Sequence, residues 1–250
     1  MNAWIAQPDQ NAPAASLVQR IESCDWLHVA AQLDEQGFAV LSGLLSAGEC
    51  DALRHGYAAD AGFRKRVVMA RHGFGRGEYQ YFDYPLPSLI QSLRHSIYPH
   101  LTAVANRWCD QMNLAHRFPD DHESFLERCH AAGQTQATPL LLRYESGDYN
   151  CLHQDLYGEH VFPLQLAALL SQPGRDFTGG EFVITEQRPR MQSRASVVPL
   201  EQGDAVVFAV HHRPIRGTRG FYRVNLRHGV SPLRSGRRFT AGIIFHDAQK

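Results

Sequence analysis

The chain has 250 residues, 44% of them hydrophobic, and a formal net charge of zero, which is typical of a soluble protein with a sizeable core. No apolar run approaches about 18 residues, and the start MNAWIAQPDQNAPAAS lacks a basic or apolar stretch, so we expect no membrane span and no secretory signal. Five cysteines without a C-x-x-C spacing favour a reduced, cytoplasmic protein over a disulfide scaffold.

The zero net charge conceals an asymmetry along the chain. Residues 1–187 contain 13 Lys and Arg against 22 Asp and Glu, whereas residues 188–250 contain 12 against 3. Most of the basic residues in the second part are arginines, whose planar guanidinium suits bidentate contacts with carboxylates and phosphates. This part therefore indicates an anionic cosubstrate or a nucleic acid, although a solvated basic face has the same composition. No sequence feature indicates an oligomeric state.

The first 135 residues predict a mainly helical support region. We expect a loose segment over residues 1–15 and a short strand with a turn over GFAVLSGLL. The apolar spacing, with a capping box from Ser46 to Glu49, predicts helices over 16–35, 46–57, 88–112 and 120–131. Residues 63–87 (FRKRVVMARHGFGRGEYQYFDYPLP) are basic, aromatic and interrupted by Gly and Pro. They predict a loop that contacts the substrate.

The residue pattern changes from helical to strand-like after Gly133. Short apolar or β-branched runs separated by Gly, Pro and Asp predict seven or eight strands of a barrel or jelly roll. These runs are ATPLLLRY, VFPLQLAALLS, GEFVITEQ, ASVVPL, DAVVFAV, YRVNLRHGV and RFTAGIIFH. We therefore expect an α+β protein in which a double-stranded β-helix (jelly-roll) core, residues 136–250, packs against the helical part, residues 1–135, in one integrated domain.

An H-x-D pair followed by a distant histidine predicts a metal site. His153 and Asp155 belong to the run LHQDL, and His228 lies in the later run LRHGV. Residues i and i+2 of a strand point the same way, so both side chains of the pair can reach one ion. Two imidazoles and one carboxylate on one face of an octahedron are the ligands of mononuclear non-haem iron(II) enzymes. His211 and His212 compete for the third position, but the spacing to Arg238 and the GV-x-P turn favour His228. His160 and His246 fall near the predicted strands and are expected to be structural or to support the ligands.

Arg238 and Thr240 predict a carboxylate receptor beside the metal. The two residues lie on the same face of the last predicted strand. A guanidinium with a neighbouring hydroxyl binds a carboxylate through a bidentate salt bridge and a further hydrogen bond. A 2-oxo acid that chelates iron through its keto oxygen and one carboxylate needs such a cation for its other carboxylate. A surface arginine in a charged turn is the alternative interpretation.

Residues 140–247 resemble the 2-oxoglutarate/Fe(II)-dependent oxygenase superfamily. The motifs RY-x-x-G, H-x-D, F-x-GGE, GD-x-VVF, H-x-V-x-P and G-x-R follow one another in the family's order, with the spacing of prolyl-hydroxylase-like members. Here they are Arg143-Tyr144 with Gly147, His153 with Asp155, Phe177 with Gly179-Gly180-Glu181, Gly203-Asp204 to Phe208, His228 with Val230 and Pro232, and Gly236 with Arg238. The blocks DYNCLHQDLYGE, DFTGGEFVITEQRPRMQSR and RHGVSPLRSGRR are more closely similar to bacterial oxygenases described as acting on damaged DNA.

The resemblance implies the chemistry of the site. Iron(II) would be held by His153, Asp155 and His228, and 2-oxoglutarate by Arg238 and Thr240, with Tyr144 lining the same pocket. The expected reaction consumes O2 and 2-oxoglutarate, releases succinate and CO2, and hydroxylates or demethylates a substrate. Cys151, two residues before the H-x-D pair, is expected to be a small buried side chain.

Three substrate classes and one silent role remain open. The arginine-rich segments EQRPRMQSR and HHRPIRGTRGFYR, with the aromatic 63–87 segment, favour an alkylated nucleic acid, because arginines bind phosphates and aromatic rings stack on bases. A prolyl or other protein side-chain hydroxylase is the first alternative, and a small-metabolite hydroxylase is the second. A catalytically silent metal-binding barrel would lack a ligand or the arginine, and this sequence lacks neither.

Overall fold

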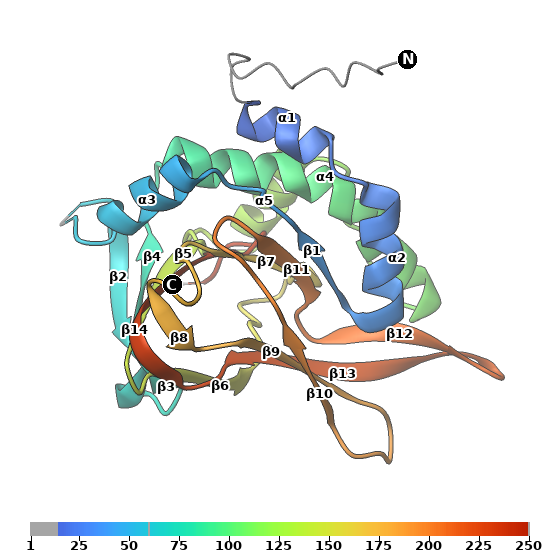
Figure 1. The fold of residues 1–250 in the computed structure, drawn as a ribbon. Coiled ribbons are helices and arrows are strands. Elements are labelled where there is room, and N and C mark those ends of the chain that lie inside the picture. The colour runs from blue at the N-terminus through green and yellow to red at the C-terminus, as the bar shows by residue number, and fades with distance from the viewer. Residues whose placement is uncertain (1–14, 60, 250) are drawn as a thin grey trace, which may run out of the picture.

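Two antiparallel β-sheets face each other, and helices cover the outer face of the larger one (Figure 1). The computed structural model describes residues 15–59 and 61–249. The loose segment expected over residues 1–15 therefore lies, except for residue 15, outside the described residues. Within the described part, no helix is long and apolar enough to cross a membrane.

The helices form where the apolar spacing predicts them. They are α1 (Leu17–Glu22), α2 (Trp26–Gln36), α3 (Ala47–Gly56), α4 (Ser88–Gln111) and α5 (His122–Ala131), with a short 3-10 helix η1 (Met69–Arg71). The predicted capping box is confirmed: Ser46 Oγ accepts from Glu49 N, and the Glu49 carboxylate accepts from Ser46 N at 2.7 Å. The long helix α4 contributes Leu93, Ile97 and Trp108, all fully buried, to the main core.

The larger sheet has the order β1-β11-β7-β14-β5-β4-β2, with β8 paired to β14. Its strands are β1 (Phe38–Leu41), β2 (Phe63–Val68), β4 (Glu78–Phe82), β5 (Leu140–Glu145), β7 (Leu164–Leu169), β8 (Phe177–Gly179), β11 (Ala205–Ala209) and β14 (Leu233–Ile243). Every residue of β7 and β11 is buried, because helices cover one face and the second sheet covers the other.

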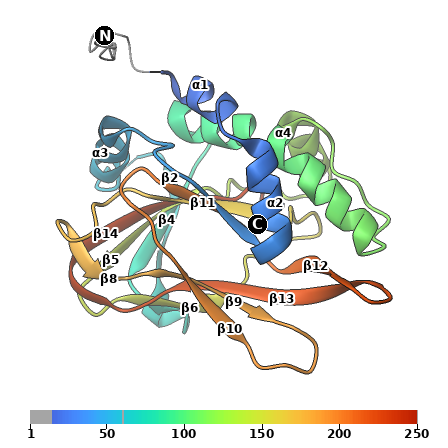
Figure 2. The ribbon, with the colours of Figure 1, turned by 45° about the vertical axis from the view of Figure 1, so that its right-hand side comes forward.

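The smaller sheet has the order β10-β9-β13-β6-β3, with β12 paired to β13. Its strands are β3 (Gly75–Arg76), β6 (Tyr149–His153), β9 (Phe182–Gln187), β10 (Arg194–Val198), β12 (His212–Gly217) and β13 (Gly220–Val230). The β9–β10 and β12–β13 hairpins extend beyond the body of the molecule (Figures 1 and 2).

The 63–87 segment is not the loop that its composition predicts. It contains β2 and β4, which extend the larger sheet beyond β5, and β3, which pairs with β6 of the smaller sheet. The pairing partners supply the backbone hydrogen bonds, and a partner distant in sequence is invisible to local composition. Since β1, β2 and β4 join the same sheet as the later strands, the boundary at residue 135 stays a prediction.

Candidate metal centre

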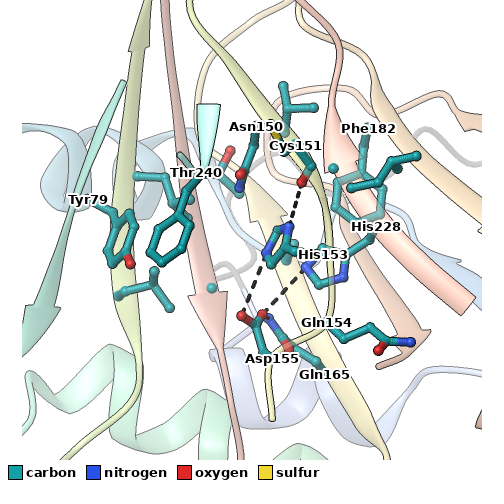
Figure 3. Close-up of a pocket in the computed structure, with 18 of the residues that line it drawn as sticks. Tyr79, Asn150, Cys151, His153, Gln154, Asp155, Gln165, Phe182, His228 and Thr240 are labelled. Carbon is teal, nitrogen blue, oxygen red and sulfur yellow. Dashed lines mark hydrogen bonds and ion pairs between the residues drawn. The ribbon is translucent and has the colours of Figure 1, made fainter. Parts of the chain in front are cut away.

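Two neighbouring strands bring the predicted ligands together. His153 ends β6 and lies directly opposite His228 of β13, and Asp155 follows two residues after the end of β6. Asp155 Oδ1 is 3.6 Å from His153 Nε2, and Asp155 Oδ2 is 3.4 Å from His228 Nε2. One ligand atom from each residue lies within 4.8 Å of the other two. Figure 3 shows the three side chains converging at one end of a cavity.

The competing histidines are not part of this cluster. Among residues 15–59 and 61–249, the only group of three or more His, Cys, Asp or Glu side chains with metal-binding spacing is His153, Asp155 and His228. His211 and His212 stack on each other instead, with ring centroids 3.4 Å apart. The position of His228 opposite His153 therefore decides between the candidates.

Polar neighbours hold the ligands in orientation. His153 Nδ1 lies 2.8 Å from the backbone oxygen of Cys151, which directs Nε2 toward Asp155. The Tyr157 hydroxyl donates to Asp155 Oδ1 at 2.7 Å, and Gln165 Nε2 donates to Asp155 Oδ2 at 2.9 Å. Sequence patterns did not identify Tyr157 or Gln165. Tyr157 lies two residues from Asp155, so its closeness in sequence could have identified it. Gln165 lies on β7, and no motif around it in the sequence indicates a contact with Asp155.

The ionised form of Asp155 is strongly favoured in this setting. Burial by itself would raise the pKa of Asp155, but the hydrogen bond from His228 and the charges of both histidines outweigh it and hold the pKa well below its usual range. Burial, followed by the neighbouring His153, lowers the pKa of His228. Metal binding requires an ionised carboxylate and a neutral imidazole, and these two pKa shifts favour those forms of Asp155 and His228.

The cavity joins this cluster to the predicted carboxylate receptor. Its volume is about 380 Å³, and its lining includes all three ligand side chains together with Tyr144, Arg238 and Thr240. The register of β5 and β14, in which Arg238 lies opposite Tyr144, brings the last three residues to the wall of this cavity. Aromatic rings supply much of the remaining wall: Tyr79, Tyr81, Tyr157, Phe182 and Phe208.

Arg238 is a buried cation without an anionic partner in the part of the chain that the structure describes. Its exposed fraction is 2%, and Nη1 donates to Thr240 Oγ1 at 2.6 Å. Among the described residues, Arg238 forms no ion pair, and its Nε and the Tyr144 hydroxyl have no hydrogen-bond partner. Burial lowers the pKa of Arg238 to about 10, so the guanidinium is still protonated at neutral pH. An unpaired buried charge is costly, and an anionic ligand would remove that cost.

Cys151 differs from the prediction. It is exposed and lines the cavity. The small apolar character of cysteine had predicted a buried side chain at this position. Cys151 lies on a short strand whose outer neighbour, β3, has only two residues. Few atoms are therefore available to cover it.

The donor set and the cation fit iron(II) and 2-oxoglutarate. Two imidazoles and one carboxylate leave three positions of an octahedral ion open. The same cavity is also lined by the Arg238 guanidinium, which suits the second carboxylate of a dicarboxylic acid. His153, Asp155 and His228 could thus bind iron.

Comparison with known proteins gives three findings. Residues 77–248 match the family Oxygenase-NA, described as "Oxygenase, catalysing oxidative methylation of damaged DNA". An uncharacterised protein of Mycobacterium tuberculosis strain H37Rv is 45% identical over 196 residues, which covers 76% of this chain and 84% of that protein. An oxidoreductase of the 2OG-Fe(II) oxygenase family from Burkholderia pseudomallei has a similar structure, with a TM-score of 0.53, 16% identity, and coverage of 91% of this chain and 94% of that one.

Two further solved structures resemble this fold. The 2-oxoglutarate-dependent epimerase SnoN from nogalamycin biosynthesis has a TM-score of 0.53 at 16% identity and covers 87% of this chain and 81% of its own. A prolyl-4-hydroxylase from Pseudomonas putida has a TM-score of 0.50 at 13% identity and covers 90% of this chain and 100% of its own. These likenesses confirm the predicted jelly-roll fold.

Proposed function

This chain belongs to the Oxygenase-NA family of oxygenases, and on that premise we propose that it hydroxylates or demethylates an alkylated nucleic acid. Its family and its fold are those of 2-oxoglutarate/Fe(II)-dependent oxygenases, which implies iron(II), 2-oxoglutarate and O2. The single observation that carries the chemistry is the shared cavity, whose lining includes both the potential iron ligands and the buried cation Arg238.

We assign the residues of the cavity as follows. His153, Asp155 and His228 would hold iron(II), and Arg238 would bind the far carboxylate of 2-oxoglutarate, with Thr240 fixing the guanidinium. The Tyr144 hydroxyl, buried without a partner, would donate to the same cosubstrate. When bound, iron(II) and 2-oxoglutarate activate O2 for the oxidation of a C–H bond.

The chain's own groups then orient the reactants and exclude water. Tyr157 and Gln165 each donate a hydrogen bond to one oxygen of Asp155, so that carboxylate keeps a single orientation. The rings of Phe182 and Phe208 lie within 6.0 and 4.5 Å of the His228 ring centroid and keep this side of the cavity apolar. For an N-methyl substrate, the overall reaction converts R2N–CH3, 2-oxoglutarate and O2 into R2N–H, formaldehyde, succinate and CO2.

Basic hairpins support the choice of a nucleic acid. The turn regions of the β9–β10 and β12–β13 hairpins contain exposed arginines at positions 190, 216 and 219, and none of the three forms an ion pair among the described residues. Unpaired arginines on projecting hairpins suit phosphates.

We also propose a cytoplasmic location, because all five cysteines are free thiols.

The test is turnover with defined substrates. Protein reconstituted with iron(II) is incubated with 2-oxoglutarate and oligonucleotides that contain N-methylated bases. We expect succinate and formaldehyde in equal amounts and a product lighter by one methylene group. A panel of proline-containing peptides and small metabolites is assayed in parallel. Hydroxylation of a peptide or metabolite, with every oligonucleotide unchanged, would replace the nucleic-acid assignment by one of the two alternatives.

A further inference from the structure

A short loop at the mouth of the cavity presents an aromatic ring to solvent. The loop, residues 71–76 with the sequence RHGFGR, begins at the last residue of η1 and includes β3. Gly73 and Phe74 line the cavity, yet 47% of Phe74 is exposed. A large apolar side chain that lines a cavity and is this exposed lacks the full cover that a core residue has.

Phe74 is one half of an aromatic pair with basic neighbours. The His72 ring stacks on it, with centroids 5.3 Å apart and planes inclined by 24°. Arg71 and Arg76 flank the pair and are exposed, and neither forms an ion pair within the described ranges 15–59 and 61–249. The loop itself contains no acidic residue.

The loop is fixed to the strand that carries the first candidate metal ligand. The backbone oxygen of Phe74 accepts from Cys151 N at 2.9 Å, and Gly75 pairs with Asn150 of β6. Gly75 has φ of 122°, and a Cβ there would lie 2.4 Å from Tyr149 O, so only glycine allows this approach. The Phe74 ring therefore has a defined position relative to His153, two residues beyond Cys151.

We propose that the RHGFGR loop is a stacking platform for an unpaired base of a nucleic-acid strand, next to the base that enters the cavity. Phe74, supported by His72, offers a flat apolar surface, and Arg71 and Arg76 bind the adjoining phosphates. Aromatic platforms with neighbouring cations are the general solution for single-stranded nucleic acids. This inference rests on the proposed function, because it names how the same site holds that substrate.

The charges favour a nucleic acid over an apolar peptide at this loop. Two unpaired guanidinium groups beside an exposed ring match a ligand that is both flat and anionic. A peptide that docked through apolar side chains would gain nothing from the two arginines.

Stacking on Phe74 is tested with a single-stranded oligonucleotide that carries 2-aminopurine beside an N-methylated base. Stacking quenches 2-aminopurine fluorescence, and anisotropy of an end label gives the dissociation constant. We expect Phe74→Ala to weaken binding about 5- to 100-fold and to abolish the quenching, whereas Phe74→Trp retains both. Leu27→Ala is the matched control, because Leu27 is 86% exposed on α2 and should change neither signal.

The outcomes separate this inference from the function on which it rests. Wild-type protein that binds and demethylates the oligonucleotide, while Phe74→Ala binds it equally well, overturns the platform and leaves the function standing. Wild-type protein that binds peptides and no oligonucleotide overturns both. Weaker binding by Phe74→Ala with recovery in Phe74→Trp supports the platform, since a general loss of folding would not be restored by a larger ring.

Discussion

The two sheets contribute to the cavity in different ways. The larger sheet is covered by helices on its outer face (Figure 1), and its residues Tyr144, Arg238 and Thr240 are each 4% exposed or less. The smaller sheet carries His153 and His228 at the cavity, but its hairpins project beyond the body of the protein (Figure 2). One wall is closed, and the other leads from the metal ligands to an accessible surface.

This difference separates two tasks. A buried, unpaired guanidinium binds a small dicarboxylic acid strongly because water does not compete for it. A large substrate needs an open approach to the metal, and the smaller sheet with its loops carries the exposed ring of Phe74 at the cavity and exposed arginines on its hairpins. We therefore expect substitutions in the larger sheet to alter cosubstrate use, and substitutions on the outer parts of the smaller sheet to alter substrate binding.

The largest effect is expected at the ligands, where the two walls meet. Asp155→Ala should lower metal affinity and 2-oxoglutarate decarboxylation by more than about 100-fold, since even outer partners of metal ligands contribute 10- to 100-fold. Metal affinity is measured by titration with cobalt(II), followed by its visible absorption. His212→Ala is the control and should behave as wild type. Full activity of Asp155→Ala would remove the metal-site assignment.

The next largest effect is expected at Arg238, on the buried side of the cavity that the larger sheet forms. Arg238→Ala should raise the KM for 2-oxoglutarate by about 10- to 100-fold, because a charge-assisted hydrogen bond in a buried site contributes about 1.5–3 kcal/mol. Cobalt(II) affinity should stay near the wild-type value. An unchanged KM would show that the cosubstrate carboxylate binds elsewhere.

Two buried histidines outside the cavity should also make the fold sensitive to acid. Burial lowers the pKa of His122 to about 2 and of His246 to about 3, from an ordinary value of 6.5. Both are neutral when folded and bind protons when unfolded below about pH 6.5, so stability is lost as the pH falls. Each histidine contributes up to about 1.4 kcal/mol per pH unit. Urea unfolding between about pH 5 and 8 measures this slope, which His246→Gln should reduce; an equal slope would contradict the assignment.

The supports of Asp155 should have smaller effects than the ligands. Tyr157→Phe removes the hydroxyl that donates to Asp155 Oδ1 and keeps the ring, so cobalt(II) affinity should fall about tenfold. The visible band should shift as the carboxylate changes orientation. Tyr79→Phe is the matched control, because Tyr79 lines the same cavity without a hydrogen bond to Asp155. Equal affinities in the two variants would show that Tyr157 only fills space.

The smallest effects are expected on the open side. Arg216→Ala and Arg219→Ala, on the β12–β13 hairpin, should each weaken oligonucleotide binding only a few-fold. Each should also reduce the slope of the logarithm of the binding constant against the logarithm of the salt concentration by about one. Turnover of 2-oxoglutarate without a nucleic acid should be unaffected. If both variants bind with the wild-type affinity and salt slope, this hairpin does not contact the nucleic acid.

The predictability of the site follows the distance over which its parts interact. The H-x-D pair and the glycine-bounded strand runs are local, and the structure places His153, Asp155 and His228 together as expected. The prediction of a loop over residues 63–87 was wrong for β2 and β4. These strands form because they pair with each other and β4 pairs with the distant β5. Gln165 could not be assigned, because its contact with Asp155 depends on where β7 lies relative to β6.

The sequence alone determined the order of the elements and the chemical groups available: two imidazoles, a carboxylate, a guanidinium and a basic C-terminal quarter. These depend on composition and on spacings of a few residues. Only the tertiary structure placed His228 directly opposite His153, left Arg238 without an anionic partner among the described residues, and exposed Phe74 beside the cavity. Each of those facts depends on strand register and on burial by residues distant in sequence, which a local pattern does not contain.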